Sequence, residues 1–143
     1  MAGLLKQPAQ APDALQTEGR VKRLRLRAAL DLESLTALAT RQLPLWLGAP
    51  REHEWAYSVR LPAGSRVSNV PESFREEARC LSIERDARRD GDRIDVRVRE
   101  VRSCPEISPA EYPAFRARTL EALNRLDERV AFSPGPVETA PAR

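Results

Sequence analysis

The chain has 143 residues, which suits one domain with a single core. Its 24 basic and 21 acidic side chains leave a formal charge of only +3 and are interleaved along the sequence, so the electrostatic footprint for nucleic acid is weak despite a pI near 9.3. One histidine and two cysteines are too few for the usual metal spacings or for a disulfide framework.

The two ends of the chain are rich in proline and alanine. We expect residues 1–17 and 133–143 to be flexible tails that flank a single β-rich domain at residues 18–132. The first twenty residues contain no apolar stretch of signal-peptide length, and no later segment is long enough to span a bilayer. As written, the chain is expected in the cytoplasm. As the tail of a longer exported protein, it would lie in the cell envelope or periplasm.

The segment "VKRLRLRAAL" alternates apolar and basic residues and predicts a half-buried strand. Its apolar face is formed by Leu24, Leu26, Ala28 and Leu30. Its basic face carries Arg23, Arg25 and Arg27, which could bind phosphate or could simply be the solvated face. No aromatic residues interleave to stack bases, so the solvated face is favoured.

A short helix is predicted near residues 31–41, with Asp31 as its cap and Leu32, Leu35 and Leu38 or Ala39 at helical spacing. The clearest strand follows at residues 53–61, where one face is His53, Trp55, Tyr57, Val59 and Leu61. It ends in a turn, with Pro62 expected at the second position and Gly64 at the last. His53 has no partner nearby in sequence, so we expect a core-edge or surface histidine rather than a base or ligand.

A hairpin is predicted around Asp90 and Gly91, the dipeptide most typical of tight hairpin loops. If these two residues form the loop, the facing pairs include Ile83 with Val98, Ala87 with Ile94, and Cys80 with Val101. Cys104 would then lie three residues beyond the partner of Cys80, too far for a disulfide in a regular ladder. We therefore expect free thiols, unless a bulge or bend intervenes.

The last predicted element is a helix at about residues 113–129. Ser108, Pro109 and Glu111 fit a helix start, but Pro113 cannot donate the bond that a continuous helix would need, so residues 108–112 should form a separate turn. The apolar stripe of this helix is Phe115, Ala122, Leu123, Leu126 and Val130. Such a stripe could meet a partner chain or a membrane surface, but its own sheet is the favoured site.

The sequence shows no combination of residues that supports catalysis. The single histidine lacks a marked nucleophile, the glycines are scattered, and no paired-cysteine metal motif is present. We expect a protein that is not an enzyme and that uses no cofactor or metal. A thiol enzyme built on Cys80 or Cys104 is the least favoured class.

The order of the segments resembles the C-terminal β-domain of bacterial transglutaminase-like proteins, large chains with an N-terminal β-domain of unknown function and a papain-like core. The matching positions are Arg41 and Pro44, then Leu61, Pro62 and Gly64, then Val70 and Pro71, and finally Tyr112, Pro113 and Arg116. The Cys, His and Asp of that core have no counterpart here, so no catalytic residue carries over. The resemblance implies a noncatalytic accessory domain whose partner is a transglutaminase-like core.

Together these features predict a mainly β (α+β) fold: β-sandwich-like antiparallel sheets, a short helix near residues 31–41, and a C-terminal helix at about residues 113–129 docked on the sheet. The expected function is protein–protein or interdomain binding. The alternative is a basic module that binds nucleic acid or another polyanion. The arginines offered as the partner surface are Arg23, Arg25, Arg27, Arg97 and Arg99.

Overall fold

The computed structural model describes residues 15–25 and 30–135. Within these residues the chain forms ten strands and two helices. The strands are β1 (Leu15–Glu18), β2 (Val21–Leu24), β3 (Leu45–Trp46), β4 (Arg51–Arg60), β5 (Arg66–Asn69), β6 (Phe74–Ala78), β7 (Leu81–Asp90), β8 (Arg93–Arg102), β9 (Glu106–Ile107) and β10 (Val130–Ser133). The helices are α1 (Leu32–Thr36) and α2 (Tyr112–Leu126). All strand pairs are antiparallel, so the predicted mainly β fold with a short helix and a C-terminal helix is confirmed.

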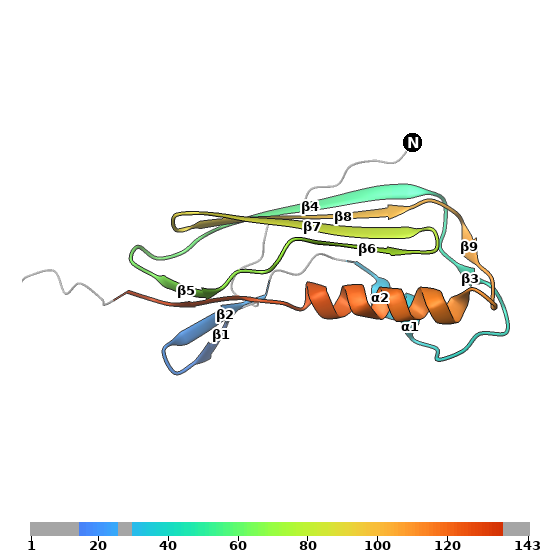
Figure 1. The fold of residues 1–143 in the computed structure, drawn as a ribbon, viewed down its shortest axis with the longest axis horizontal. Helices are drawn as coiled ribbons and strands as arrows, with labels where there is room; N and C mark the ends of the chain where they lie inside the picture. The colour runs from blue at the N-terminus through green and yellow to red at the C-terminus, as the bar shows by residue number, and fades with distance from the viewer. Residues whose placement is uncertain (1–14, 26–29, 136–143) are drawn as a thin grey trace, which may run out of the picture.

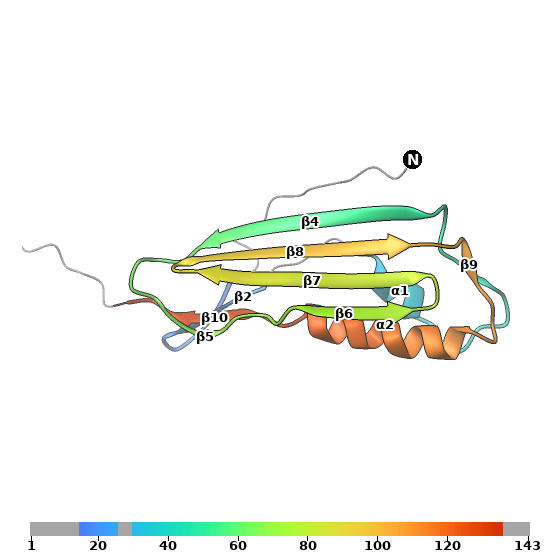
Figure 2. The same ribbon diagram turned by 45° about the horizontal axis from the view of Figure 1, so that its top comes forward.

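The largest sheet has the strand order β4-β8-β7-β6 and is shown face-on in Figure 2. Alternate residues of each strand point to the same face, and those on one face are mostly apolar. As predicted, Trp55 and Tyr57 lie on the buried face of β4, and the turn after β4 contains Pro62 and Gly64. The turn lies one residue later than predicted, because the Ser65 amide bonds to the Pro62 carbonyl and Gly64, at φ 78°, takes the third position.

The β7–β8 hairpin forms where the sequence predicted it, but its loop is Gly91 and Asp92 rather than Asp90 and Gly91. Asp90 pairs with Arg93, and Gly91 has a φ of 60°, so the glycine supplies the left-handed conformation at the first loop position. This shift changes every predicted pair by two residues. Ile83 faces Glu100 instead of Val98, and Ala87 faces Val96 instead of Ile94.

The same shift overturns the expectation of free thiols. Cys80, in the loop between β6 and β7, lies opposite Ser103, whose amide donates to the Cys80 carbonyl over 2.9 Å. Cys104 is therefore only one residue beyond the partner of Cys80. The two cysteines form a disulfide with a Cα–Cα distance of 5.3 Å.

The apolar face of the main sheet is covered at one end by the helices and at the other by a smaller sheet of order β1-β2-β10-β5 (Figure 1). Two hydrophobic clusters result. The cluster under the helices contains Leu32, Leu35, Leu45, Leu47, Phe74, Leu81, Ile83, Ile107, Tyr112, Phe115 and Ala122. The cluster under the smaller sheet contains Leu24, Trp55, Tyr57, Leu61, Ile94, Val96, Val98, Val130 and Phe132. This layering confirms the sandwich-like arrangement with a docked C-terminal helix.

The start of α2 agrees with the prediction to within one residue. The Ser108 hydroxyl donates to the Glu111 carboxylate over 2.9 Å and accepts from the Glu111 amide over 3.2 Å, which closes the separate turn. The same hydroxyl holds the pKa of Glu111 below its usual range. The helix ends at Leu126, so Val130, predicted as part of its stripe, instead lies fully buried in β10.

Three other predictions need correction near the N-terminus. The first strand of the predicted domain runs only over β2, and Leu26, Arg27 and Ala28 lie outside the described residues. Asp31 takes the cap position of α1, but its side chain makes no capping hydrogen bond. Residues 15–17, assigned to a tail, belong to β1. The remainder of that tail, residues 1–14, lies outside the described residues, as do residues 136–143 of the C-terminal tail.

Candidate binding surfaces

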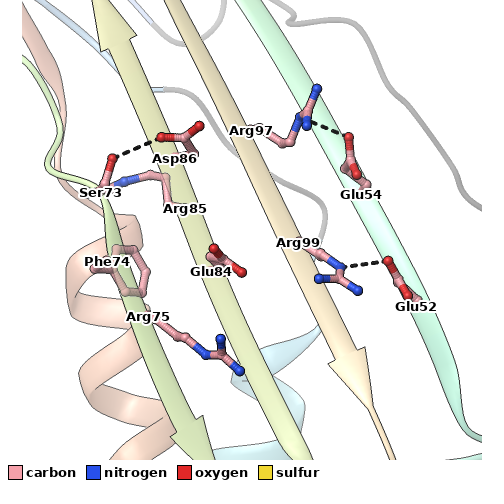
Figure 3. Close-up of a pocket in the computed structure, with 10 residues that line it drawn as sticks. All are labelled: Glu52, Glu54, Ser73, Phe74, Arg75, Glu84, Arg85, Asp86, Arg97 and Arg99. Atoms are coloured by element: carbon pink, nitrogen blue, oxygen red, sulfur yellow. Dashed lines mark hydrogen bonds and ion pairs between the residues drawn. The ribbon is translucent and has the colours of Figure 1, made fainter.

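The outer face of the main sheet, defined by the outward side chains of β4, β8, β7 and β6, carries no covering element among the described residues. Directly paired positions across the four strands alternate in charge, in the order Glu54, Arg99, Glu84 and Arg75. A shallow hollow of about 540 Å³ lies over these residues (Figure 3). The face is therefore wide and polar, with no enclosed cavity for a small ligand.

The two predicted arginines on this face are already paired with carboxylates. Arg99 Nε lies 2.6 Å from Glu52 Oε1, and Arg97 Nε lies 3.1 Å from Glu54 Oε1 (Figure 3). The hydrogen bond from Arg99 holds the pKa of Glu52 below its usual range, and Glu52 in turn raises the pKa of Arg99. A phosphate group would have to compete with these carboxylates, so the outer face is a mixed-charge surface rather than a basic patch.

The other predicted arginines lie elsewhere. Arg23 and Arg25 belong to β2 and the residue after it, on the layer beneath the main sheet, and Arg25 Nη2 lies 2.7 Å from Asp127 Oδ1 just after α2. Arg27 lies outside the described residues. The structure therefore brings Arg97 and Arg99 together but does not join them to Arg23 and Arg25.

An exposed apolar group that sequence reasoning missed lies at the end of the molecule where β3 pairs with β9 (Figures 1 and 2). We call it the Trp46 end and define it by Trp46 on β3 and by Leu38 and Leu43 in the segment that leads from α1 into β3, residues that are 67%, 53% and 74% exposed. Leu45 and Leu47 are buried and Trp46 between them is exposed, but all three residues are apolar, so no alternation in the sequence marked this site.

The frame that carries Trp46 is held by several contacts. The Leu47 amide donates to the Pro105 carbonyl over 2.6 Å, and Arg102 Nη1 donates to the Leu47 carbonyl over 3.2 Å. Arg102 is itself buried and paired with Glu100 at 2.9 Å. The backbone next to Trp46 is therefore positioned by Arg102 of β8 and by Pro105 in the segment before β9, which favours a preformed contact site.

The loop between α1 and β3, which also contributes to the Trp46 end, is fixed by α2. The Tyr112 hydroxyl donates to the Leu38 carbonyl, and Arg116 Nε donates to the Thr36 carbonyl over 3.0 Å. The Arg41 guanidinium lies 5.6 Å from the centre of the Tyr112 ring. Three residues of the family resemblance, Arg41, Tyr112 and Arg116, thus meet at one junction and hold the end of α1.

The described residues show where the side chains considered for chemistry lie. Both cysteines are in the disulfide, and the His53 ring lies edge-on to Trp55 at 5.4 Å. Residues 15–25 and 30–135 contain no group of three or more His, Cys, Asp or Glu side chains that could hold a metal ion. Nor does this part of the chain contain a helix long and apolar enough to cross a membrane.

Comparison with solved structures found a chain from Parabacteroides distasonis ATCC 8503, named a "putative protease", which superposes with a TM-score of 0.71 at 19% sequence identity. The match covers 93% of this chain and 27% of that one, so this chain spans about a quarter of the solved protein's length. A search of curated protein sequences found no match. The sequence model of a domain of unknown function with solved structure, DUF3858, matches residues 23–132, and the chain therefore belongs to the DUF3858 family.

Proposed function

We propose that this protein is a noncatalytic accessory domain that docks through its Trp46 end onto a papain-like, transglutaminase-type core. The core would lie in the same parent chain or in a separately encoded subunit. The similarity to a protein more than three times as long, named as a protease, supports an association with a larger catalytic body. The order of motifs resembles that of transglutaminase-like proteins, which supports a transglutaminase-type core as the catalytic body.

The observation that carries the proposal is the exposure of Trp46 and Leu43. These two side chains are the most exposed large apolar groups of the described residues, and they lie three positions apart on a braced frame. A tryptophan offers a large contact area with few rotatable bonds, and such residues are enriched where binding energy concentrates. Large exposed apolar residues concentrated in one short segment, here between Leu38 and Trp46, support a contact surface.

The structure gives less support to the alternative, a polyanion-binding module. Arg97, Arg99 and Arg25 each face a carboxylate, and acidic side chains alternate with basic ones over the outer face. No aromatic side chain lies among the outward residues of β4 or β8 to stack on a base. The polyanion alternative therefore has no specific observation in its favour.

The proposal is tested by co-purification from an extract of the source cells. The bait is the tagged full chain, and a second bait carries Trp46→Ala. The matched control carries Leu120→Ala, which removes a 38% exposed apolar side chain from the outer side of α2. A papain-like core should be identified by mass spectrometry with the wild-type and Leu120→Ala baits and should be strongly reduced with Trp46→Ala.

Two results would contradict the proposal. One is recovery of the wild-type chain only as a free monomer, or mainly with nucleic acid. The other is amidase, peptidase or crosslinking activity in the purified chain, because a noncatalytic domain should have none of these.

A further inference from the structure

We infer that the Cys80–Cys104 disulfide fixes the Trp46 end in the working protein, and that the protein therefore works in an oxidising compartment. This inference does not depend on the proposed function, because it concerns the state of the chain itself and needs no partner. The sequence contains only these two cysteines, and the bond uses both.

The backbone at Cys80 supports a specific role for this cysteine. Its φ is 61°, and it is the only residue other than glycine with positive φ in the part of the chain that the structure describes. Tight-loop positions of this kind favour Gly, Asn or Asp, since a side chain there crowds the backbone. A cysteine at such a position needs a compensating interaction, and the bond to Cys104 supplies it.

The bond adds a covalent link to segments that are otherwise held by hydrogen bonds, such as those from the Ser103 amide to the Cys80 carbonyl and from the Leu47 amide to the Pro105 carbonyl. Cys80 lies in the β6–β7 loop, and Cys104 lies in the segment that leaves β8 and leads into β9. β9 pairs with β3 through only two residue pairs, Leu45 with Ile107 and Trp46 with Glu106. Fixing Cys104 to the main sheet therefore restrains β9, and through the ladder it restrains β3 and Trp46.

Disulfides that serve as structural crosslinks form and persist in secreted, periplasmic or cell-surface proteins, whereas cytosolic thiols are kept reduced. Formation is a balanced exchange. The thiols of Cys80 and Cys104 lose two electrons and two protons in total to a protein disulfide oxidant of that compartment, whose own disulfide is reduced to a dithiol. Of the two locations that the sequence left open, the disulfide therefore favours the cell envelope or periplasm over the cytoplasm.

The compartment is tested on protein taken from the source cells. Cells are quenched in acid, thiols are alkylated, and the intact mass is measured before and after reduction. We expect no alkylation of Cys80 or Cys104 until the protein is reduced, and then alkylation of both. Alkylation of either cysteine without reduction would overturn the inference.

The fixing role is tested by backbone ¹⁵N relaxation, which reports motion within the folded state rather than overall stability. In the Cys80→Ser, Cys104→Ser variant we expect order parameters at residues 45–47 to fall from a rigid value of about 0.85 to below about 0.6. Those in the centre of β8 should remain high.

A control separates the bond from the strained backbone. Cys80→Gly, Cys104→Ser also lacks the bond but places at residue 80 an amino acid that accepts positive φ without strain. The same loss of order at residues 45–47 is expected there. Unchanged order parameters in both variants would overturn the fixing role.

Discussion

Arg85 Nη2 lies 2.6 Å from Glu128 Oε1, a contact that ties the buried face of the main sheet to the segment between α2 and β10. The same guanidinium donates to the carbonyls of Glu72 and Arg125 over 2.6 to 2.9 Å, and its carbon lies 4.9 Å from the Phe74 ring centre. Burial lowers the pKa of Arg85, while Glu128 acts in the opposite direction. One inward arginine thus donates hydrogen bonds to backbone carbonyls at the end of α2 and in the loop before β6.

Arg85→Ala should destabilise the fold by about 1 to 3 kcal/mol, because it leaves the partly exposed Glu128 carboxylate and the carbonyls of Glu72 and Arg125 without their donor. Urea unfolding measures the change. Arg88→Ala is the matched control on the same strand, since Arg88 is 80% exposed and its ion pair is solvated. The control should change stability by less than about 0.5 kcal/mol. Equal effects of the two substitutions would contradict this role for Arg85.

Phe115→Ala should cost about 3 to 5 kcal/mol, since Phe115 is 1% exposed in the cluster beneath the helices. Leu120→Ala, on the outer side of the same helix, should cost less than about 1 kcal/mol. Denaturant unfolding compares the two. A loss below about 1 kcal/mol for Phe115→Ala would mean that the helix does not bury this face.

Stability should fall in alkaline solution because of Tyr57. Burial raises the pKa of Tyr57 from 10.0 to about 12, so the folded state holds its proton more tightly than the unfolded state does. The resulting stabilisation is complete below about pH 10 and is lost between about pH 10 and 12, by about 2 to 3 kcal/mol in total. In Tyr57→Phe this part of the pH dependence should disappear. A variant with the same alkaline profile as the wild type would disprove the assignment.

Any affinity for nucleic acid should be weak, because the arginines of the outer face are paired with carboxylates. Binding of a fluorescent single-stranded DNA should be barely measurable at physiological salt. A tight complex whose affinity falls steeply with salt concentration would instead support the polyanion alternative.

Local patterns in the sequence were enough to predict much of the fold. Strict alternation from His53 to Leu61 identified β4, and Pro113 placed the start of α2 to within one residue. These signals depend on neighbouring residues alone. The strand order could not be predicted, because β2 pairs with β10 through residues more than a hundred positions apart.

The errors came from details that local patterns do not determine. Aspartate-glycine marked the β7–β8 loop, but whether glycine takes its first or second position depends on the whole ladder. This difference of one position determined whether Cys80 and Cys104 lie close enough to form a disulfide. Arg85, Glu100 and Arg102 point into the covered face of the sheet, where an alternation rule expects apolar residues. Trp46 lies in a two-residue strand, too short for a clear periodic signal.

The central claim, docking through the Trp46 end, is most directly tested by tryptophan fluorescence. The chain has two tryptophans, of which Trp46 is 67% exposed and Trp55 is 3% exposed. A Trp55→Phe variant therefore reports on Trp46 alone. The titrant is a papain-like, transglutaminase-type core from the source organism in which every tryptophan is replaced by phenylalanine. We predict a saturable blue shift of the Trp46 emission and protection from acrylamide quenching. An emission spectrum unchanged at a core concentration that forms the complex would show that docking occurs elsewhere and would contradict the account.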